Sequence, residues 1–567
     1  MEQVTPTRRN FLKSASAATV AMVAAQPVVA RAATPAFQEQ PAGTEILPRP
    51  DRITARFGLR GLIPLQYAGR EWTASGVHVT AEPASQHGIP ITVVHAAAKL
   101  THLHVRWERK QRGSIWLLGD QWERSYGDLE WRGTVPNRVM PWYFLTFDGH
   151  SLDSYGVTVQ PSVFCFWQQD PDGITLTLDL TSGGEPVALA ERQLHACTVV
   201  TRKGSPEEPL AHAARKFCGM MCPSPRLPKG ALFGSNDWNY AYGKNTAEGI
   251  LRDVDLIASL APHGDVRPYV VIDDGYQDPT RFPSMSDLAA HIRQRHVRPG
   301  IWIRPLRAPQ TAPRNLLLPQ TRLGRSGGEL PAYDPTIPEA LEQILQSVVT
   351  PAHWGYEFIK HDFTTFELFG RWGFDMRTGP ARPGWSFNDR SRTNAEIVRD
   401  LYLGIRRAAG EQTIVLACNT VGHIAAGIFE SQRIADDTSG REWERTRRFG
   451  VNGLAQRIAQ HRTFFHMDPD CVAITPAIGW RETSQWMDVV SRSGTSLFLS
   501  PQPDAITPEI KSAMRDAMAI SSQDAYGYPA DPLQGTTPSR WQFERPMQIA
   551  RDYDWCGPEG ASAFLVS

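Results

Sequence analysis

Residues 356–363 read Tyr-Glu-Phe-Ile-Lys-His-Asp-Phe, a short β-strand pattern that ends in a carboxylate. Side chains two positions apart point to the same face of a strand, so Lys360 and Asp362 are expected to project together from the end of this one. A neighbouring cation keeps a carboxylate ionised at neutral pH. An ionised, positioned aspartate is what an enzyme needs when it forms a covalent intermediate with its substrate. An ordinary ion pair at a strand end explains the two residues equally well.

The surrounding sequence places this stretch in a repeating series of strands and helices. From Ala231 onward, short apolar strand patterns alternate with amphipathic helical patterns, which is typical of parallel β/α units. Eight such units over roughly 270 residues match a (β/α)8 TIM barrel in number and size. The predicted strands are 231–235, 268–273, 299–304, 356–362, 413–418, 431–436, 463–468 and 495–500, with helices at 246–260, 284–296, 337–349 and 394–410.

The sequence before and after the predicted barrel shows a different pattern of secondary structure. Short alternating runs such as 91–94 and 174–178, separated by Gly, Pro and Asp, predict an antiparallel β-sandwich. After the barrel, a helix at 507–520 and strand patterns at 540–543 and 561–567 predict a small C-terminal β-element. The expected organisation is a signal peptide, a linker, a β-sandwich with its connector, a catalytic barrel, and a C-terminal helix with a β-element, at residues 1–32, 33–50, 51–228, 229–505 and 506–567.

The N-terminus carries an export pattern. Residues 8–13 read Arg-Arg-Asn-Phe-Leu-Lys, a twin-arginine motif, and an Ala/Val-rich stretch leads to a small-x-small cleavage site at Ala30-Arg31-Ala32. This stretch is too short and too rich in small residues for a membrane span. The sequence therefore predicts a periplasmic or secreted protein that has no membrane segment once the signal is removed.

Composition narrows the class of partner. The 567-residue chain has 59 Lys+Arg and 59 Asp+Glu, so no basic excess indicates nucleic acid or an anionic membrane. Its 17 Trp favour a carbohydrate partner, because indole rings pack on the flat apolar faces of sugars, although most will fill the core. The oligomeric state stays open, a homo-oligomer included.

No cofactor or metal is expected. The chain has no G-x-G-x-x-G after a strand and no Walker loop. Its seven cysteines show neither C-x-x-C nor zinc spacing, and Cys218 and Cys222, four apart on a predicted helix, could form a disulfide only with distortion. The cysteines are 165, 197, 218, 222, 418, 471 and 556.

Polar side chains cluster where the predicted barrel strands end. Catalytic groups of such barrels lie at the carboxyl ends of the strands. A single Asp there usually caps the following helix, but caps need one acceptor each, not groups with Lys, Arg and Trp. The strand-end residues in question are Asn236, Asp237 and Trp238; Asp273 and Asp274; Trp302 and Arg304; Lys360 and Asp362; Cys418 and Asn419; Arg433, Asp436 and Asp437; and Asp468 and Asp470.

Two of these strand ends offer a pair of carboxylates for glycoside hydrolysis. Asp362 is the predicted nucleophile, and a retaining glycosidase needs a second carboxyl group about 5–5.5 Å away. In an extended strand Asp437 shares a face with Arg433, whereas Asp436 faces the other way. Asp437 is therefore preferred as the general acid/base, with Asp436 as the alternative, because a bulge at the strand end would reverse which of the two faces Arg433. A general acid also needs a raised pKa.

Five ordered motifs in the barrel resemble the α-galactosidases of glycoside hydrolase family 36 and its melibiase clan. The resemblance covers roughly residues 231–500, and the predicted β-sandwich before the barrel and β-piece after it match the family layout. The motifs are Ile272-Asp273-Asp274-Gly275-Tyr276, Gly300-Ile301-Trp302, Phe358-Ile359-Lys360-His361-Asp362-Phe363, Arg433-Ile434-Ala435-Asp436-Asp437-Thr438 and Asp468-Pro469-Asp470-Cys471.

The resemblance implies retaining hydrolysis of terminal α-galactosides without a cofactor. It places the nucleophile at Asp362 and the acid/base at the aspartate of Arg-x-x-x-Asp, which is Asp437. It implies that the other matched residues bind substrate: Asp273 and Asp274 the 4- and 6-hydroxyls, Lys360 the 3- and 4-hydroxyls, Arg433 the 2-hydroxyl, Trp302 as a wall, and Cys418 near the 2-position. Trp238 and Asp470 are further substrate-binding candidates, and Trp122 or Trp142 of residues 119–127 and beyond could reach the rim.

Some positions depart from the family pattern. Residues 235–238 replace a segment that is often aromatic, Arg304 stands where a neutral or acidic residue is common, and Asn419 where glycine is usual. These positions border the sugar, so an N-acetylgalactosamine or β-L-arabinopyranose substrate is an alternative, although Cys418 argues against the extra bulk of the former. A carbohydrate-binding protein on a degenerate barrel would have lost one carboxylate, yet both candidates are present.

Overall fold

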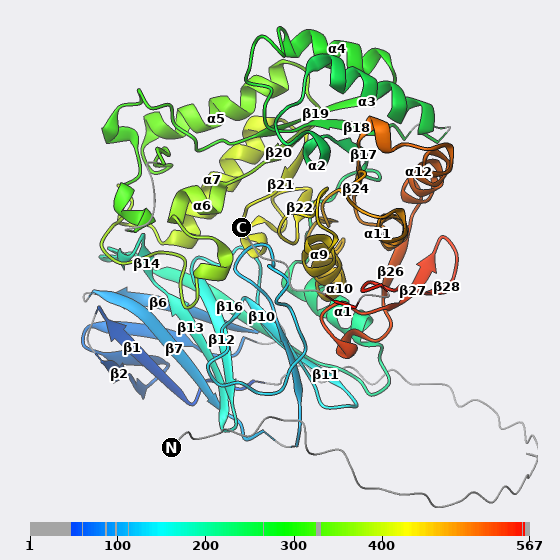
Figure 1. Ribbon diagram of the computed structural model, residues 1–567. Helices are drawn as coiled ribbons and strands as arrows, with labels where there is room; N and C mark the ends of the chain where they lie inside the picture. Colours follow the sequence, from blue (N-terminus) through cyan, green and yellow to red (C-terminus); the bar gives the residue numbers. More distant parts are fainter. Residues whose placement is uncertain are drawn as a thin grey trace, which may run out of the picture. The chain divides into compact units, whose positions relative to one another are not determined.

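The computed structural model describes residues 47–58, 61–84, 88–96, 99–111, 113–262, 264, 266–324, 330–557 and 560–561, all within the unit Ala42–Ser567 (Figure 1). The predicted signal peptide, most of the linker and the strand pattern at the C-terminus lie outside these residues.

The first part of the chain forms two antiparallel sheets, as its alternating pattern predicts. Strand β5 shows the alternation clearly, because Val77, Val79 and Ala81 are buried while the residues between them are half-buried. Phe144 and Trp167, one from each sheet, have ring centroids 5.7 Å apart, so the sheets share a core. In the described residues the first sheet has the order β2 (Leu62–Pro64), β1 (Arg52–Phe57), β7 (Leu100–Glu108), β13 (Gly173–Asp179), β12 (Phe164–Asp170) and β9 (Met140–Pro141).

The second sheet is longer and is followed by the connector helix. Its order is β3 (Gln66–Ala68), β4 (Glu71–Ala74), β5 (Val77–Ala81), β6 (Ile89–Ala96), β16 (Leu194–Lys203), β11 (Leu152–Val157), β10 (Tyr143–Phe147) and β8 (Trp116–Gly119). A short hairpin, β14 (Thr181–Ser182) and β15 (Glu185–Pro186), and helix α1 (Leu210–Met221) complete this part.

A parallel sheet follows, and it contains all eight predicted barrel strands. Its strands are buried on both faces, which explains why they read as continuous apolar runs. The order in the described residues is β23 (His466–Asp468), β22 (Ser431–Arg433), β21 (Ile414–Ala417), β20 (Phe358–His361), β19 (Arg298–Ile303), β18 (Tyr269–Ile272), β17 (Phe233–Asn236), β25 (Leu497–Pro501) and β24 (Val472–Ile474).

The two edge strands of this sheet, β23 and β24, are successive in the chain. Residues 469–471 separate them, with Pro469 unable to donate and Asp470 in a left-handed conformation (φ 76°). The seventh predicted strand is thus broken, with one half paired to β22 and the other to β25. Because so few residues join the edges, the sheet must curl into a barrel, and Ser496 also donates its backbone N–H to Met467 O at 3.0 Å.

Helices cover the outside of the parallel strands (Figure 1). The four predicted helices form, and side-chain caps fix the starts of three of them, for example Thr393 and Glu396 in a capping box on α7. The larger helices are α3 (Ala247–Leu260), α4 (Met285–Gln294), α5 (Pro338–His353), α7 (Asn394–Ala409), α11 (Trp480–Ser493) and α12 (Pro508–Ser521). Short helices at strand ends are α2 (Trp238–Ala241), α6 (Thr364–Phe369) and α8 (Gly422–Ala425).

The connection after β22 is irregular. It consists of α9 (Trp443–Arg445), a π-helix η4 (Thr446–Val451), α10 (Asn452–Arg457) and the 3-10 turn η5 (Ile458–Gln460). π-Helical turns are rare and occur mostly at functional sites. Here the turn directly follows Arg445, which contacts the candidate acid/base residues described below.

A small antiparallel sheet ends the described chain. It consists of β26 (Tyr526–Pro529), β27 (Arg540–Arg545) and β28 (Ile549–Asp552). The predicted helix and the first predicted strand of the C-terminal β-element are therefore present. The remaining 3-10 turns are η1 (Arg314–Leu316), η2 (Gln320–Leu323), η3 (Gly373–Asp375), η6 (Pro503–Ala505) and η7 (Pro532–Gln534).

Candidate active site

Asp362 lies one residue beyond strand β20 and is held at both carboxylate oxygens. Its backbone N–H still donates to Ile303 O at 3.0 Å, so the strand ladder extends to it. Oδ1 accepts from the N–H of Phe363 at 2.7 Å, and Oδ2 accepts from Trp302 Nε1 at 3.2 Å. Phe363 has a left-handed backbone (φ 62°), which turns the chain into α6. The carboxylate is thus fixed by neighbours on two adjacent strands.

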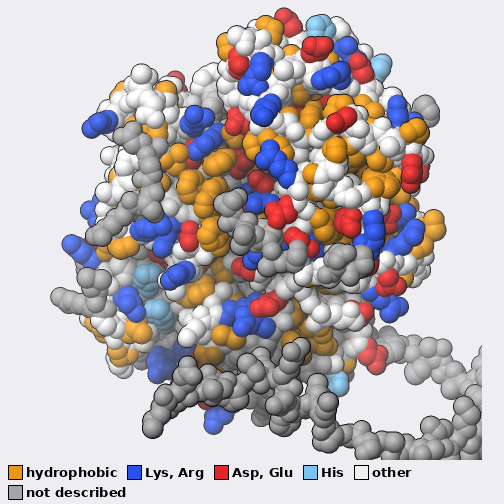
Figure 2. Space-filling view, in the orientation of Figure 1, with side chains coloured by type: hydrophobic (Ala, Val, Ile, Leu, Met, Phe, Trp, Pro, Cys, Tyr) orange, Lys and Arg blue, Asp and Glu red, His pale blue; other side chains and the backbone are white. Residues whose placement is uncertain are grey.

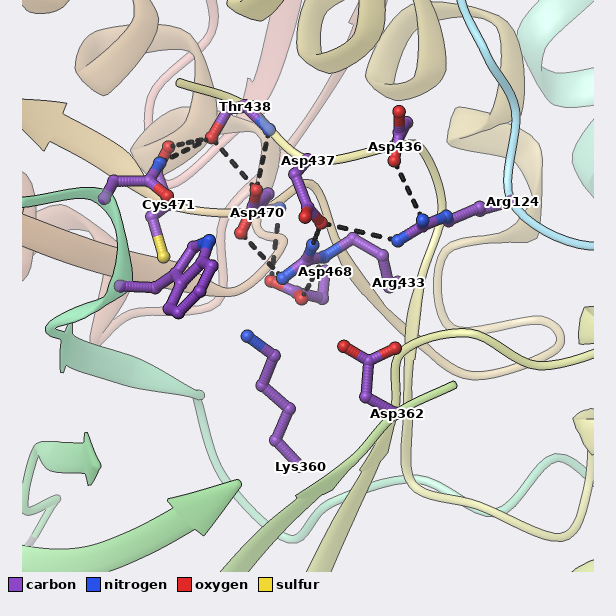
Figure 3. A network of polar contacts seen from close by, with 12 residues as sticks. Arg124, Lys360, Asp362, Arg433, Asp436, Asp437, Thr438, Asp468, Asp470 and Cys471 are labelled. Atoms are coloured by element: carbon purple, nitrogen blue, oxygen red, sulfur yellow. Dashed lines mark hydrogen bonds and ion pairs between the residues drawn. The ribbon is translucent and has the colours of Figure 1, made fainter. Parts of the chain in front are cut away.

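The expected ion pair between Lys360 and Asp362 is wrong, because Lys360 binds a different carboxylate. Its Nζ lies 2.7 Å from Asp273 Oδ2, and the two side chains are 7% and 4% exposed. Burial by itself would lower the pKa of Lys360, but Asp273 and the other nearby acids outweigh it and raise that pKa well above its usual value. Lys360 and Asp362 nevertheless extend into the same space, as Figure 3 shows. The long lysine side chain reaches past β19 to the end of β18.

Asp273 is supported from the end of β17. Asn236 Nδ2 donates to Asp273 Oδ2 at 2.8 Å, and the Asp273 backbone N–H donates to Asp237 Oδ1 at 2.7 Å. Burial, followed by the charge of Asp273, raises the pKa of Asp237 to about 7. The departure at residues 235–238 is therefore part of the support for Asp273.

Asp274 and Trp238 contact residues close to them in the sequence, just after β18 and β17. Asp274 Oδ1 accepts from the N–H of Gly275 and from Gln277, each at 3.0 Å, which closes the turn after β18. Trp238 begins α2 and packs edge-on against Tyr242, with ring centroids 5.6 Å apart. Both side chains are half-buried.

Arg433 at the end of β22 joins three carboxylates. The parallel register places it beside Asp468 of β23, which accepts from its Nε at 2.8 Å. The other two contacts are to Asp470 at 2.6 Å and to Asp437 at 3.0 Å (Figure 3). Arg433 and Asp468 are each 2% exposed at the side chain. A planar guanidinium suits such a buried site because its fixed donors can serve several oxygens at once.

Asp437 and Asp436 lie in different surroundings. Strand β22 ends at Arg433, so the alternation expected for an extended strand does not continue to residue 437, yet Asp437 does meet Arg433. The Asp437 side chain is 39% exposed, whereas that of Asp436 is 15% exposed and lies between Arg124 at 2.9 Å and Arg445 at 3.0 Å. In Figure 3 Asp437 lies over Arg433, and Asp436 lies at the outer side near Arg124.

The pKa values of the two aspartates shift in opposite directions. Burial raises the pKa of Asp436, and the charge of Asp437 adds to this effect, against Arg124 and Arg445. Burial also acts to raise the pKa of Asp437, but Arg124, Arg433 and Lys360 together outweigh it and hold that pKa below its usual value. In the free protein, the raised pKa expected of a general acid is therefore found at Asp436 and not at Asp437.

Arg124 comes from the β-sandwich and was missed by the sequence analysis. Its guanidinium lies 2.9 Å from Asp436 Oδ1 and 3.4 Å from Asp437 Oδ1. The neighbouring Ser125 donates its N–H to Ile434 O at 2.9 Å and accepts from the N–H of Asp436 at 2.8 Å. The sandwich thus adds a strand-like segment beside the extension of β22, and a charged residue within residues 119–127 was the only signal for it.

The expectation that Trp122 or Trp142 reaches the rim of the site is wrong. They are 2% and 0% exposed and pack edge-on against each other inside the sandwich, with ring centroids 5.3 Å apart. Tyr126 of the same segment lies closer to the candidate acid/base residues, although it too is buried. Its ring centroid lies 5.7 Å from the Arg124 guanidinium carbon.

Two buried residues at the end of β21 explain another departure from the family pattern. Asn419 donates to Glu123 of the sandwich and accepts from the N–H of Phe366 at 3.0 Å. Cys418 is fully buried, and burial raises the pKa of its thiol well above the usual value, against the charges of Arg433 and Lys360. Asn419 is therefore an anchor between the sandwich and the barrel.

Arg304, a third departure, is already paired. Its Nε lies 2.6 Å from Glu367 Oε1, and its guanidinium carbon lies 4.1 Å from the ring centroid of Phe363. Burial raises the pKa of Glu367 to about 7 despite this partner. Arg304 thus packs behind Asp362 and holds the turn that carries it.

Metal-binding clusters and membrane-spanning helices are absent from the described residues. There, no group of three or more His, Cys, Asp and Glu side chains is arranged to hold a metal ion. No helix in that part of the chain has both the length and the apolar character needed to cross a bilayer. All seven cysteines lie in the described residues and carry free thiols.

Comparison with known proteins identifies the architecture. No protein-family model matches the chain. Among solved structures it is similar to TtGalA, an α-galactosidase from Thermus thermophilus in complex with p-nitrophenyl α-D-galactopyranoside, with 17% identity, 86% of this chain and 99% of that chain covered, and a TM-score of 0.59. The chain has the fold of the α-galactosidases.

Two further solved structures of α-galactosidases are similar to this chain in fold. The family 36 α-galactosidase AgaA from Geobacillus stearothermophilus has 12% identity, covers 87% of this chain and 79% of its own, and has a TM-score of 0.58. The α-galactosidase from Lactobacillus brevis has 10% identity, coverages of 87% and 76%, and a TM-score of 0.54. The resemblance to family 36 that the motifs predict is thus confirmed at the level of the fold, and these neighbours are glycoside hydrolases.

Proposed function

We propose that this protein is a retaining, exo-acting glycoside hydrolase that releases terminal α-linked galactose from oligosaccharides or glycans. The observation that carries the proposal is the placement of Asp362 and Asp437. Asp362 directly follows β20, Asp437 lies four residues beyond the end of β22, and both lie around one space, which Lys360 and Arg433 also border (Figure 3). Two carboxyl groups at one sugar site are what glycoside hydrolysis requires.

Asp362 is the proposed nucleophile. In the first step one of its oxygens bonds to the anomeric carbon while the bond to the leaving oxygen breaks, and that oxygen takes a proton from the acid/base residue. In the second step water attacks the same carbon, gives its proton to the acid/base residue and frees Asp362. The hydrogen bonds from Trp302 and Phe363 support this role, because they orient the carboxylate before the sugar arrives.

Asp437 is the proposed acid/base, with Asp436 as the alternative. Exposure favours Asp437, since its side chain is the more accessible of the two. The pKa directions favour Asp436 in the free protein. Our proposal therefore requires that a bound sugar, by excluding water from Asp437, raises the pKa of this residue before the first step.

The polar residues around this pair are proposed to bind the sugar hydroxyls. Asp273 and Lys360, already joined as a buried ion pair, would face the 3-, 4- and 6-hydroxyls together with Asp274. Arg433 would face the 2-hydroxyl near Cys418, and Trp302 would form the wall. Trp238 and Asp470 complete the proposed set, with Asp470 acting through Arg433.

The function is tested with nitrophenyl glycosides. We expect turnover of the α-galactoside above that of the α-N-acetylgalactosaminide and the β-L-arabinopyranoside, with the first-formed product seen by NMR as the α-anomer. Asp362→Asn should lower kcat by about 10³-fold or more. The control is Asp504→Asn in the turn η6. Absence of activity on all three substrates would overturn the enzyme assignment, and a β-anomer would overturn the retaining mechanism.

The acid/base residue is identified by comparing substrates whose leaving groups do and do not need a proton. The variant that lacks it should keep activity on 2,4-dinitrophenyl α-galactoside, whose leaving group needs no proton, and lose it on an alkyl galactoside. Azide should restore its turnover and give α-galactosyl azide. We expect this behaviour from Asp437→Ala and not from Asp436→Ala. The reverse result would assign the role to Asp436.

Export of the protein is proposed from the sequence. The twin-arginine motif supports a periplasmic or secreted location. Expression of the full chain with Arg8→Lys and Arg9→Lys, followed by cell fractionation, should leave the protein in the cytoplasm, whereas the unaltered chain should leave it. Equal export of both would contradict the proposal.

A further inference from the structure

A row of aromatic rings starts beside the candidate nucleophile. Trp302 donates to Asp362, and its ring centroid lies 6.5 Å from that of Phe363. Phe363 in turn lies 5.7 Å from Trp372, which stacks on Phe366 at 4.3 Å. Figure 2 shows hydrophobic side chains gathered on the surface over α6, the helix that begins with this turn. The row therefore leads away from the proposed sugar site along the segment that follows β20.

The same row ends beside the candidate acid/base pair. The guanidinium carbon of Arg124 lies 5.3 Å from the ring centroid of Trp372, and this guanidinium binds both Asp436 and Asp437. Tyr126, next to Arg124 in the sandwich segment, meets Phe374 edge-on with ring centroids 4.9 Å apart. The acid/base residue must reach the oxygen that joins the galactose to its leaving group. Trp372, Tyr126 and Phe374 therefore lie on the leaving-group side of the site.

Phe374 has no role in the core. Its side chain is 55% exposed, although it packs against Tyr126 on one side. Asp375 and Arg377, which follow it, are exposed as well. An exposed aromatic ring with charged neighbours offers an apolar face with hydrogen-bonding groups at its edge. This combination matches a pyranose ring, which has one apolar face and a rim of hydroxyls.

The segment that carries Phe374 is held in place from the sandwich. The N–H of Gly373 donates to Glu123 Oε1 at 2.7 Å, and Glu123 also accepts from Tyr126 and Asn419. The contact is close, because a Cβ added to Gly373 would lie 2.5 Å from Glu123 Cγ. Residues 373–375 form the 3-10 turn η3, which fixes the direction of Phe374. The ring is therefore positioned before a ligand binds, which lowers the entropic cost of binding.

We propose that Phe374 and Trp372, with the buried Tyr126 supporting Phe374, form a binding site for the leaving-group sugar, a pyranose whose apolar face packs on Phe374. The inference rests on the proposed glycosidase function and extends it. It predicts that the natural substrates are galactosides of saccharides and not of alkyl or small polar alcohols. It also assigns a positioning role in specificity to the sandwich, since Tyr126 and Glu123, which hold Phe374 in place, come from that part of the chain.

The test compares substrates that do and do not reach this site. Kinetics are measured for α-galactosyl fluoride, p-nitrophenyl α-galactoside and stachyose. The variants are Phe374→Ala, Phe374→Tyr and, as a matched control with a similarly exposed apolar side chain, Met547→Ala (62% exposed). We expect Phe374→Ala to lower kcat/KM for stachyose about five- to tenfold and to leave the fluoride unchanged. Phe374→Tyr should restore most of the loss, and Met547→Ala should match the wild type on every substrate.

Several results would overturn the inference. A loss that is equal for the fluoride and for stachyose would mean that Phe374 affects the whole site, and no loss on stachyose would mean that it binds no sugar. A loss confined to the nitrophenyl substrate would assign the ring to aryl groups instead. If the wild type hydrolyses the fluoride, and Phe374→Ala has the same kcat/KM for stachyose as the wild type, the proposed function stands and only this binding site is ruled out.

A binding measurement tests the sugar site in the case where the proposed glycosidase function fails. If the wild type hydrolyses none of the three substrates, the proposed function fails, and stachyose is then titrated into wild type and Phe374→Ala by calorimetry. Saturable binding that is weakened several-fold by Phe374→Ala supports the sugar site alone. Absence of binding, or equal binding by both proteins, overturns it.

Discussion

The guanidinium of Arg124 lies 3.4 Å from the carboxylate of Asp437, although 313 residues separate them in the chain. Arg124 belongs to the sandwich and Asp437 follows a barrel strand. This contact and the one to Asp436 place a fixed positive charge beside both candidate acid/base groups. Arg433, Lys360 and Arg445 of the barrel also act on Asp437, so the charge around this residue comes from both parts of the chain.

Removal of Arg124 should move the pH profile of the reaction. Arg124 lowers the pKa of Asp437, so Arg124→Met should raise that pKa. The acid/base residue must be protonated in the first step, and a higher pKa keeps it protonated to higher pH. We expect the alkaline limb of kcat/KM to shift toward higher pH for a substrate with a poor leaving group.

The control for this shift is Arg124→Lys, which keeps the positive charge. Its profile should stay near that of the wild type even if its rate falls. A profile of Arg124→Met that does not move, or that moves toward lower pH, would show that Arg124 does not control the protonation of the pair.

Arg433 should contribute strongly to the stability of the fold. Arg433→Met leaves Asp468 and Asp470, 2% and 4% exposed, without their buried counter-charge. Breaking a buried ion pair in this way costs about 3–5 kcal/mol, measured as the free energy of unfolding in urea. Adding Asp468→Asn should recover part of the loss, because one unpaired charge is then removed.

The comparison for Arg433 is a half-buried ion pair between neighbouring turns of one helix. Arg492 binds Asp488 one turn away on α11, with side chains 17% and 30% exposed. Arg492→Met should cost less than about 1 kcal/mol. Equal losses for Arg433→Met and Arg492→Met would contradict the importance that we assign to the buried cluster.

Asp253 should make the protein less stable as the pH rises. It is 4% exposed on α3, and burial raises its pKa to about 7, against the hydrogen bond from Tyr240. The folded state then holds a proton that the unfolded state has already lost, so the contribution of this carboxyl to stability is full below pH 4 and is lost as the pH rises toward 7. The change amounts to about 4 kcal/mol at most.

Asp253→Asn imitates the protonated carboxyl and should remove this dependence. Urea unfolding between pH 4 and 8 should find the variant more stable than the wild type at pH 8 and similar to it at pH 4. Asp255→Asn on the same helix is the matched control, because Asp255 is 64% exposed at the side chain and pairs with Arg295 at the surface. If both variants have the same free energy of unfolding as the wild type at every pH, ionisation of Asp253 does not destabilise the folded protein and the prediction is wrong.

Glu123 should be replaceable only together with Asn419. Glu123 is 1% exposed and accepts from Tyr126, Gly373 and Asn419. In Glu123→Gln the new amide faces the amide of Asn419, which cannot turn over because its oxygen accepts from Phe366. Two opposed donors should cost about 1–3 kcal/mol of the free energy of unfolding.

The double variant Glu123→Gln, Asn419→Asp restores one donor and one acceptor at this contact. It should recover most of the stability and of the activity on stachyose. Additive losses in a double-mutant cycle would show that the two residues do not interact in the way that the distances indicate.

The arrangement of the chain was largely predictable from local patterns. Apolar strands of four to seven residues separated by amphipathic helices specify parallel β/α units, because buried strands need helices on their outer face. The eight strand positions around Lys360 and Arg433 followed from this rule. The break at Pro469 and Asp470, which splits the seventh strand between two neighbours, did not follow, since it depends on how the two edges of the sheet meet.

The residues of the site were predictable to the extent that strand ends gather them. Parallel strands bring their carboxyl ends to one edge, so it was predictable from position alone that Asp273, Asp362 and Arg433 lie near one another; their roles stay predictions. Their partners were not. Lys360 shares a strand face with Asp362 but binds Asp273, because a long side chain selects its ion pair among all the charges within reach.

By itself the sequence determined the fold and the set of strand-end residues, because both follow from local periodicity and from the order of the strands. Only the tertiary structure decided which charges pair, that Arg124 of the sandwich reaches Asp437, and that Phe374 is exposed beside Tyr126 while Trp122 is buried. The physical reason is that electrostatic and packing contacts depend on distance in space, and a separation of hundreds of residues leaves no local pattern from which that distance can be inferred.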